Sequence, residues 1–394
     1  MTMEIEKVTL DDKPPMTAAD MCHEQIYIYP VKSLRPVSVE RASIGRYGFV
    51  NDRVFMLLKV HRDPETSDVT RLENMHISDF PKMSLFLTSI EAKDGPNSSH
   101  LSKVVVTYTP PRPTSLEQLS HGAANDQISI PLQPATQPLE NIQVEMHKSP
   151  TTAYNMGSSY NDWFSARFGY EVILAFVGSN SRAVLGNLSP NAAGTLPTPQ
   201  STTSSLFGSL RSMIPLPKPT TAGSKDDSRI AFQDCAHFLV VTTESLADVS
   251  ARLPDGQTMD VTKFRPNIVL SGAEGGAWVE DYWGELTIAD DILVPLTANC
   301  VRCQSINVDY ATGAPGTDES GAVLKKLQKD RRVDAGAKYN PCFGRYGFRH
   351  KDDVGKLVSV GMKVAVTKVN EERTKFGTSF SMIISDTQDH YAHC

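Results

Sequence analysis

The sequence has few cysteines and no long apolar run, and these two scarcities limit what the protein can be. Six cysteines in 394 residues are too few for a scaffold held together by disulfides. No run of about 18 or more apolar residues occurs, so we predict no membrane span. The first 20 residues are polar and partly acidic, unlike a secretory signal or a transit peptide. We therefore expect a cytoplasmic protein with reduced thiols.

A basic stripe is missing as well. The formal net charge is −6, whereas nucleic-acid-binding proteins usually concentrate Lys and Arg on one face. We therefore expect no nucleic-acid partner. Apolar residues make up 40% and charged residues 21%, which is typical of a soluble globular protein. The length favours two packed units or one large unit.

Strand patterns dominate the regular segments. Alternating or continuous apolar runs bounded by Gly, Pro and Asn predict strands from residue 25 onward and a hairpin that turns at Gly361. Helices are predicted after the serines at 158–159, ending at Gly169, after Thr243 as N-cap, and within 320–332. The predicted fold class is mixed α/β and β-rich, with a barrel-like or mixed sheet.

Residues 178–228 differ from the rest of the chain in composition. Ser, Thr, Pro, Gly and Asn dominate them and aromatics are few, so they cannot bury enough apolar surface to offset the entropy of ordering. We predict a disordered surface insertion. The chain then divides into a first unit at 22–150, a helix and strand connecting segment at 151–177, the insertion at 178–228 and a second unit at 229–370.

The stretch "NCVRCQSINVD" (299–309) places Cys300 and Cys303 three positions apart. A structural zinc site would need a second ligand pair, and none is present at a matching spacing. A redox dithiol would open a helix, but this pair follows a strand and leads into a strand-like segment. The remaining possibility is one thiolate presented to a soft metal or to a sulfur-transfer substrate, with the charge of Arg302 favouring its ionised form.

Seven collinear motifs resemble the MOSC superfamily, and in particular the amidoxime-reducing component and YcbX-like family. The motifs are "YPVKS" (29–33), "NDRVFML" (51–57), "TTESLADVSARL" (242–253), "FRPNIVLSG" (264–272), "EDYWGELTIAD" (280–290), "CVRCQSINVDYATG" (300–313) and "FGRYG" (343–347). The resemblance implies a MOSC N-terminal β-barrel-type domain at 22–150 and a MOSC domain at 229–370, also built on a β-barrel. It also implies that the two hold a molybdenum cofactor (molybdopterin) between them.

What the family does is carried over as an expectation. Its metal is ligated by the second cysteine of Cys-x-Arg-Cys, which is Cys303 here. The relatives reduce N-hydroxylated compounds such as amidoximes by two electrons, which a donor of the cytochrome b5 and cytochrome b5 reductase type supplies. No four-cysteine cluster of a ferredoxin domain is present, so a separate donor protein is expected. The pyridoxal-phosphate-dependent domain of the long sulfurases would have to precede residue 25, where we expect none.

Five polar residues in otherwise apolar segments are candidates for holding the cofactor: Lys32, Ser33, Arg53, Arg265 and Asn267. Guanidinium groups bind phosphate oxygens in a bidentate way. A charged side chain among apolar neighbours is costly without a partner. For each residue alone, a structural ion pair or a snorkelling side chain is the favoured interpretation, and the collinear match reverses this preference toward the cofactor.

Further candidates depend more on the alignment with the family. Arg302 and Arg71 are assigned to the cofactor, Arg71 with less support because extra residues follow "VTRLENMHI" before the next strand. Asn155 could contact the cofactor or cap the next helix, and Asp309 could lie near the substrate as a catalytic group or hold its loop. The family's Asp-Thr-Ser-Pro is "DCAH" (234–237) here, so two hydroxyls of that wall are absent.

The main hypothesis is a molybdenum-cofactor oxidoreductase with Cys303 as the metal ligand. One rival is a carrier without redox chemistry, which would hand on the cofactor or a persulfide formed on Cys303. Another is a cofactor-free descendant whose fold only mediates contacts.

Overall fold

The computed structural model describes residues 21–92, 101–111, 126–184 and 229–375. Most of the predicted insertion lies outside these residues. Its first part, 178–184, is described and includes the strand β13 (Arg182–Ala183), which pairs with β14 (Arg229–Ile230). The Arg182 guanidinium is buried and donates to the carbonyl of Ala231 at 3.1 Å, which holds this strand against the second half of the chain.

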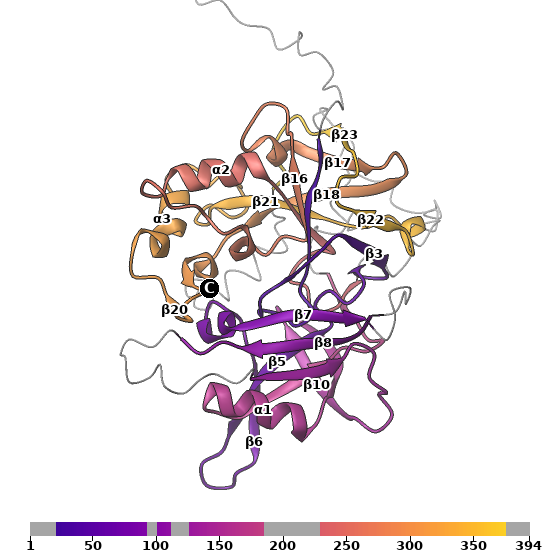
Figure 1. The fold of residues 1–394 in the computed structure, drawn as a ribbon, viewed down its shortest axis with the longest axis vertical. Helices are drawn as coiled ribbons and strands as arrows, with labels where there is room; N and C mark the ends of the chain where they lie inside the picture. The colour runs from indigo at the N-terminus through magenta and orange to yellow at the C-terminus, as the bar shows by residue number, and fades with distance from the viewer. Residues whose placement is uncertain (1–20, 93–100, 112–125, 185–228, 376–394) are drawn as a thin grey trace, which may run out of the picture.

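The described chain forms two tiers (Figure 1). The upper tier, mostly orange and yellow, contains an eight-stranded mixed sheet in the order β2-β1-β16-β15-β21-β18-β17-β23. All of its pairs are antiparallel except β15 with β16. Its strands are β1 (Cys22–Ile28), β2 (Val37–Val39), β15 (Phe238–Thr242), β16 (Ile268–Ser271), β17 (Trp283–Ile288), β18 (Ile292–Val301), β21 (Cys342–Gly347) and β23 (Val364–Val369).

The lower tier, indigo to magenta, contains the smaller sheets of the N-terminal half (Figure 1). A five-stranded sheet has the order β10-β11-β12-β5-β6, and β7, β8 and β9 form a second sheet. These strands are β5 (Phe55–Arg62), β6 (Val69–Asn74), β7 (Phe86–Ala92), β8 (Leu101–Tyr108), β9 (Gln127–Pro131), β10 (Glu140–Met146), β11 (Ser149–Asn155) and β12 (Val172–Phe176). With only three α-helices described, the structure confirms the predicted β-rich mixed class.

The first strand of the chain belongs to the upper tier. β1 pairs with β16, and β2 pairs with β1. A small sheet then joins β3 (Arg41–Gly45) to β4 (Gly48–Phe49) and to β22 (Leu357–Ser359). β22 and β23 therefore pair with different strands, and the predicted hairpin at Gly361 is wrong. The chain reaches the lower tier only after these strands, so its two halves are interleaved.

The helices begin and end close to the predicted positions. α1 (Ser158–Phe168) ends at Gly169, which has the left-handed conformation that glycine favours. α2 (Thr243–Ala251) is capped by Thr242, whose hydroxyl accepts from the Ser245 N–H, and not by Thr243 as predicted. α3 is short (Val323–Leu327). No helix among the described residues is long and apolar enough to cross a membrane.

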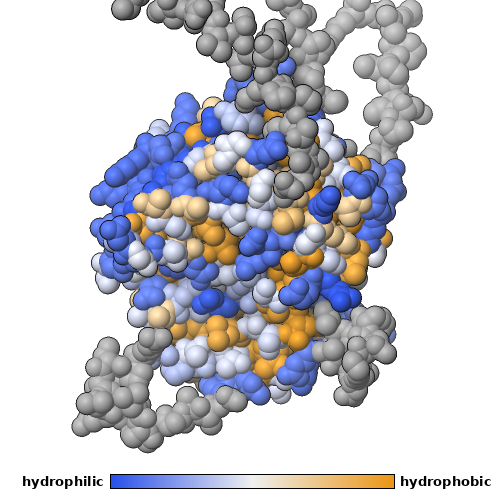
Figure 2. Space-filling model, turned by 45° about the horizontal axis from the view of Figure 1, so that its top comes forward, coloured by the Kyte–Doolittle hydropathy of each residue, from blue (hydrophilic) through white to orange (hydrophobic). Residues whose placement is uncertain are grey.

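Buried apolar side chains form several clusters that lie on both sides of the interface between the tiers. Phe55, Leu57 and Phe164 belong to the cluster of the lower tier. Another cluster, which includes Phe264 and Phe343, lies under α2 and α3. The outer face seen in Figure 2 mixes hydrophobic and hydrophilic patches. The polar residues that line the interface thus lie between packed apolar clusters.

Candidate functional site

A cavity of about 550 Å³ lies where the two tiers meet, and residues of both tiers line it. The lower tier contributes Lys32, Arg53, His76 and His147. The upper tier contributes Tyr346 and residues within the segments 233–239, 264–267, 300–305 and 335–340. Seven of the residues singled out from the sequence lie on this wall: Lys32, Ser33, Arg53, Arg265, Asn267, Arg302 and Cys303. Residues more than 200 positions apart in the sequence therefore share one site.

The two cysteines of the Cys-x-x-Cys pair occupy different environments. Cys300 is buried at the end of β18, and burial raises the pKa of its thiol. Cys303 is partly exposed to the cavity and precedes a 3-10 turn (Gln304–Asn307), where its thiol contacts the Ser305 hydroxyl at 3.2 Å. The segment after the pair is thus a turn and not the expected strand. Cys303 is the accessible thiol of the pair.

Arg302 binds the buried cysteine of the pair. Its Nη1 lies 2.8 Å from Sγ of Cys300, and its Nη2 donates to the Phe264 carbonyl at 2.9 Å. The direct contact of Arg302 is thus with Cys300, and its charge also interacts with Cys303. That this charge favours the ionised form of the exposed thiol stays a prediction. Nε of Arg302 is buried and has no hydrogen-bond partner in the described chain.

Arg53 ties the two tiers together. Its guanidinium donates to Asp52 at 2.5 Å, to the side chain of Asn267 at 3.2 Å and to the backbone carbonyl of Arg265 at 3.0 Å. Asn267 is itself used up by the fold, because its amide also bonds the Tyr27 carbonyl and the Leu239 N–H. Arg53 and Asn267 thus fix the segment that carries Arg265.

Arg265 keeps part of its hydrogen-bonding capacity. Its Nη1 donates to the Leu34 carbonyl at 3.0 Å, whereas its buried Nη2 has no hydrogen-bond partner in the described chain. Its guanidinium and that of Arg53 each lie 4.4 Å from the ring centre of Tyr29, a favourable cation–π distance.

The backbone at three of the cavity residues is strained. Ser33, Arg53 and Arg265 have φ values of 68°, 53° and 60°, a region that residues with a Cβ rarely adopt. Such strain persists where the surrounding structure enforces it, and it is frequent at ligand sites.

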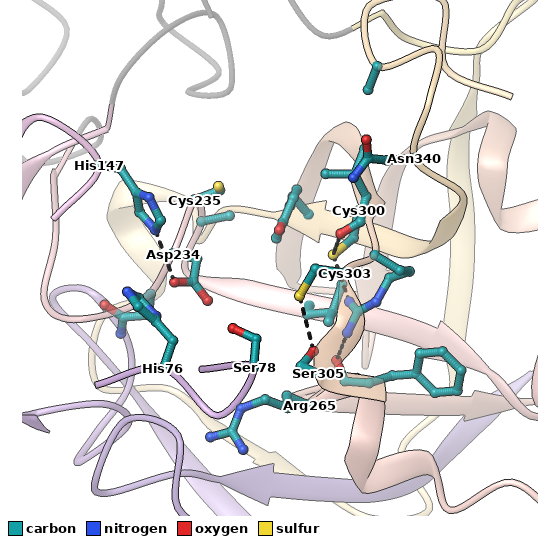
Figure 3. A pocket seen from close by; sticks show the side chains of 18 of the residues that line it. His76, Ser78, His147, Asp234, Cys235, Arg265, Cys300, Cys303, Ser305 and Asn340 are labelled. Carbon is teal, nitrogen blue, oxygen red and sulfur yellow. Dashed lines mark hydrogen bonds and ion pairs between the residues drawn. The ribbon is translucent and has the colours of Figure 1, made fainter. Parts of the chain in front are cut away.

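A second polar group lies on the other side of the cavity from Cys303 (Figure 3). Lys32, which is buried, forms an ion pair with Asp234, and Nε2 of His147 lies 3.4 Å from the same carboxylate. The rings of His76 and His147 are 5.8 Å apart. Burial, followed by the charge of Lys32, lowers the pKa of His76 to about 3, so His76 is neutral near pH 7.

The charge of the wall favours an anionic ligand. Among the described residues that line the cavity, Lys32, Arg53, Arg265, Arg302 and Lys338 are cationic, and Asp234 is the single carboxylate. A phosphate and a dithiolene would meet this excess of positive charge and the N–H groups of Arg265 and Arg302 that lack partners. The residues present therefore fit a molybdenum cofactor.

No group of three or more His, Cys, Asp or Glu side chains in the described ranges could hold a metal ion by itself. A metal at this site would have to arrive with further ligands of its own. Cys303 offers one soft thiolate ligand to such a metal.

Three residues predicted for the site lie outside the cavity. Arg71 on β6 is 58% exposed and contacts His61 and Glu73. Asn155 accepts from the Gly157 N–H and orients the start of α1, which is the alternative left open by the sequence. Asp309 accepts from the Ala311 N–H and the Thr312 hydroxyl in its own turn. The expected cofactor or catalytic contacts of these three need correction, because local hydrogen bonds hold them elsewhere.

Several lining residues were not predicted as site residues. His76 and His147 are single histidines in strand-turn segments, and nothing in their local pattern indicates a ligand. Asp234 and Cys235 were noted only as a departure from the family's motif. Tyr346 lies within "FGRYG", a motif that was used only for the family resemblance. The exposed loop at 335–340 contributes Tyr339, a residue that is 70% exposed.

Comparison with known protein families agrees with this arrangement. The model described as the MOSC N-terminal beta barrel domain matches residues 22–171, and the model of the MOSC domain matches residues 227–365. The two matches together include the segments that line the cavity. The structure of the YUAD protein from Bacillus subtilis matches 36% of this chain and 71% of that chain at 12% identity, with a TM-score of 0.22, too low to carry an argument.

Three curated relatives show the range of the similarity. Mitochondrial amidoxime-reducing component 1 of Mus musculus is 26% identical over 82% of this chain and 76% of its own length. The Homo sapiens protein of that name is 37% identical over 30% of this chain and 34% of its own length.

The molybdenum cofactor sulfurase of Arabidopsis thaliana is 25% identical over 79% of this chain and 31% of its own length. The chain thus spans about a third of the length of the plant and human relatives. The two family models and the cavity between the tiers lead to one conclusion: the chain belongs to the MOSC-domain proteins that carry an N-terminal MOSC β-barrel domain.

Proposed function

We propose that the protein is a molybdenum-cofactor oxidoreductase that reduces N-hydroxylated compounds of the amidoxime type, with electrons from a separate donor protein. The observation that carries the proposal is the inequality of the two cysteines. Cys303 presents its thiol to a cation-lined cavity, whereas Cys300 is buried. The similarity to amidoxime-reducing components, which extends over most of the mouse protein, supports the substrate class.

The chain's own residues would divide the work as follows. The Cys303 thiolate would ligate the metal, with the Ser305 hydroxyl beside its sulfur. Arg265, Arg302 and Lys32 would offset the negative charge of the cofactor. Arg53 and Asn267 would act through Arg265 by fixing its backbone. When bound, the cofactor supplies the two-electron chemistry.

The balanced reaction shows which electrons and protons must reach the site. Reduction of an amidoxime breaks one N–O bond and releases the oxygen as water, and it consumes two electrons and two protons. The electrons would come from a protein of the cytochrome b5 and cytochrome b5 reductase type, as the family resemblance suggests. A cytoplasmic location remains part of the proposal.

The test is to express the full chain in a host that makes the cofactor and to measure bound molybdenum and pterin. We expect wild type and Cys300→Ser to contain both, since serine leaves an acceptor for Arg302, and Cys303→Ser to lose most of the molybdenum. The loaded protein should reduce benzamidoxime with an artificial electron donor. If wild type and Cys303→Ser hold equally little metal, the proposal is wrong.

A second candidate function is a carrier that hands on the cofactor or a persulfide from Cys303. The similarity to a molybdenum cofactor sulfurase over 79% of this chain favours it. Metal-loaded protein that fails to reduce any N-hydroxylated substrate, but that transfers cofactor or sulfane sulfur to an acceptor enzyme, would support the carrier.

A further inference from the structure

One exposed aromatic side chain lies at the opening of the cavity. Tyr339 lines the cavity wall and is nevertheless 70% exposed. The other Phe and Tyr side chains of that wall are more covered, since Phe238 and Phe264 are buried and Tyr346 is half-buried. Within the described chain, the Tyr339 side chain forms no hydrogen bond and no ring contact. Its ring is therefore free to contact a bound molecule.

The backbone holds this ring on a well-defined turn. The Asn340 N–H donates to the Ala337 carbonyl at 3.1 Å, so Lys338 and Tyr339 are the two central residues of a β-turn. Just before this turn, the carboxylate of buried Asp334 accepts a backbone N–H at 2.8 Å. Neither central residue has a positive φ value, so most residue types fit these positions. The turn itself therefore does not require a tyrosine.

The same turn is bonded to the segment that carries Cys303. The Arg302 N–H donates to the carbonyl of Pro341 at 2.8 Å. Asn340, the last residue of the turn, lies on the same side of the cavity as Cys303 (Figure 3). Tyr339 is thus held at the opening on the side of the accessible thiol.

The proposed reaction determines which part of a substrate reaches this ring. The N–O bond of an amidoxime has to lie near Cys303, so the substituent on the amidoxime carbon extends towards the opening. An aryl substituent is planar and apolar, and two aromatic rings attract each other when they stack with an offset or meet edge to face. A tyrosine side chain supplies such a contact at a small entropic cost, because it has only two χ angles to fix. A methyl substituent is too short for this contact.

We propose that Tyr339 determines the substrate preference of the site by providing a stacking surface for a planar aryl group. Aryl-bearing N-hydroxylated compounds then bind more tightly than short aliphatic ones. This inference rests on the proposed function, which supplies the reacting group of the substrate.

The test compares benzamidoxime with acetamidoxime as substrates of the cofactor-loaded full chain, with an artificial electron donor. Tyr339→Ala should raise KM for benzamidoxime about fivefold, as expected for the loss of an aromatic pair. It should leave KM for acetamidoxime and both kcat values unchanged. Tyr339→Phe keeps the ring and should behave as wild type. Leu357→Ala is the matched control, because it removes an exposed apolar side chain on β22, outside the cavity.

A binding measurement gives a readout that does not depend on turnover. Saturation-transfer NMR on the purified protein without an electron donor should show about fivefold weaker binding of benzamidoxime to Tyr339→Ala than to wild type. The Tyr339 side chain is exposed and backbone hydrogen bonds close its turn, so the variants should melt at the temperature of wild type. No binding to wild type, unchanged binding to Tyr339→Ala, or an equal loss for acetamidoxime would overturn the inference.

The outcomes also separate this inference from the proposed function. Wild type that binds benzamidoxime through Tyr339 but reduces no N-hydroxylated compound contradicts the proposed function alone. Wild type that reduces both compounds, with no effect of Tyr339→Ala on KM or binding, contradicts the inference alone. If Tyr339→Ala slows the reduction of both compounds with a protein donor and of neither with an artificial donor, the ring contacts the donor protein and the inference is wrong.

Discussion

Replacing Arg53 with Met tests whether the cavity wall and the fold depend on the same buried cation. The guanidinium forms three hydrogen bonds, to Asp52, Asn267 and the Arg265 carbonyl. Both Arg53 and Asp52 are almost fully buried. Without Arg53, the carboxylate of Asp52 keeps only the Tyr29 N–H at 2.9 Å among its described partners.

The expected loss of stability follows from this burial. Removing one partner of a buried ion pair leaves an uncompensated charge and costs about 3–5 kcal/mol. Arg53→Lys keeps the charge but not the planar fork, so we expect a smaller loss of about 1–3 kcal/mol. Arg71→Met is the matched control. That arginine is 58% exposed, and its ion pair should contribute less than about 1 kcal/mol.

Urea unfolding of the cofactor-free variants measures the effect. At an unchanged slope, the shift in midpoint reports the change in the free energy of unfolding. Because Arg53 also fixes the Arg265 backbone, its loss should lower the pterin content of the loaded protein, whereas Arg71→Met should not. A midpoint for Arg53→Met within error of that for Arg71→Met would refute the reasoning.

Three further predictions concern the upper tier. Burial raises the pKa of Glu280 to about 7. Relative to Glu280→Gln, wild type should lose about 3 kcal/mol of unfolding free energy as the pH rises from about 4.5 to about 7, because the folded state holds the proton longer. Parallel pH profiles from chemical denaturation would contradict this. Thr242→Ala should lower the free energy of unfolding by about 1 kcal/mol, because it removes the hydroxyl that accepts from the Ser245 N–H at the start of α2. Thr243→Ala should lower it much less. Equal melting temperatures for the two variants would show that Thr242 is not the cap. Gly344→Ala should lower the free energy of unfolding by more than about 2 kcal/mol, since φ is +84° and a Cβ would lie 2.8 Å from the Val240 carbonyl oxygen. A melting temperature equal to that of wild type would contradict this.

The parts of the site that could be predicted are those whose signal lies in the local sequence. Arg53 and Asn267 stand out because a polar group in an apolar strand needs a partner, and the structure shows those partners. The pair Cys300 and Cys303 stands out because close cysteines are rare in this chain, and the family resemblance then singles out Cys303. The β-rich class follows from the period of the apolar residues.

The parts that could not be predicted depend on contacts between distant segments. Nothing near residue 22 shows that β1 pairs with β16, because strand pairing is decided by the whole sheet. His147 lies in a two-residue turn with positive φ values, where His and Lys are unusual. The sequence therefore indicated neither this turn nor the place of His147 at the cavity. For Arg71, the prediction from the family resemblance was wrong in the other direction. The resemblance indicated a cofactor contact, but the side chain lies on the exposed surface of β6.

The cations of the cavity wall differ in how many of their hydrogen-bond donors already bind other protein groups. The amino group of Lys32 is engaged by Asp234, and Arg53 bonds Asp52, Asn267 and a carbonyl. By contrast, Nη2 of Arg265 and Nε of Arg302 are buried without a hydrogen-bond partner in the described chain. A buried N–H that bonds nothing is costly, so these two groups would gain most from an anionic ligand. Arg265 and Arg302 are therefore the residues from which we expect direct contacts with the cofactor. Arg53 and Asn267 instead determine where Arg265 stands.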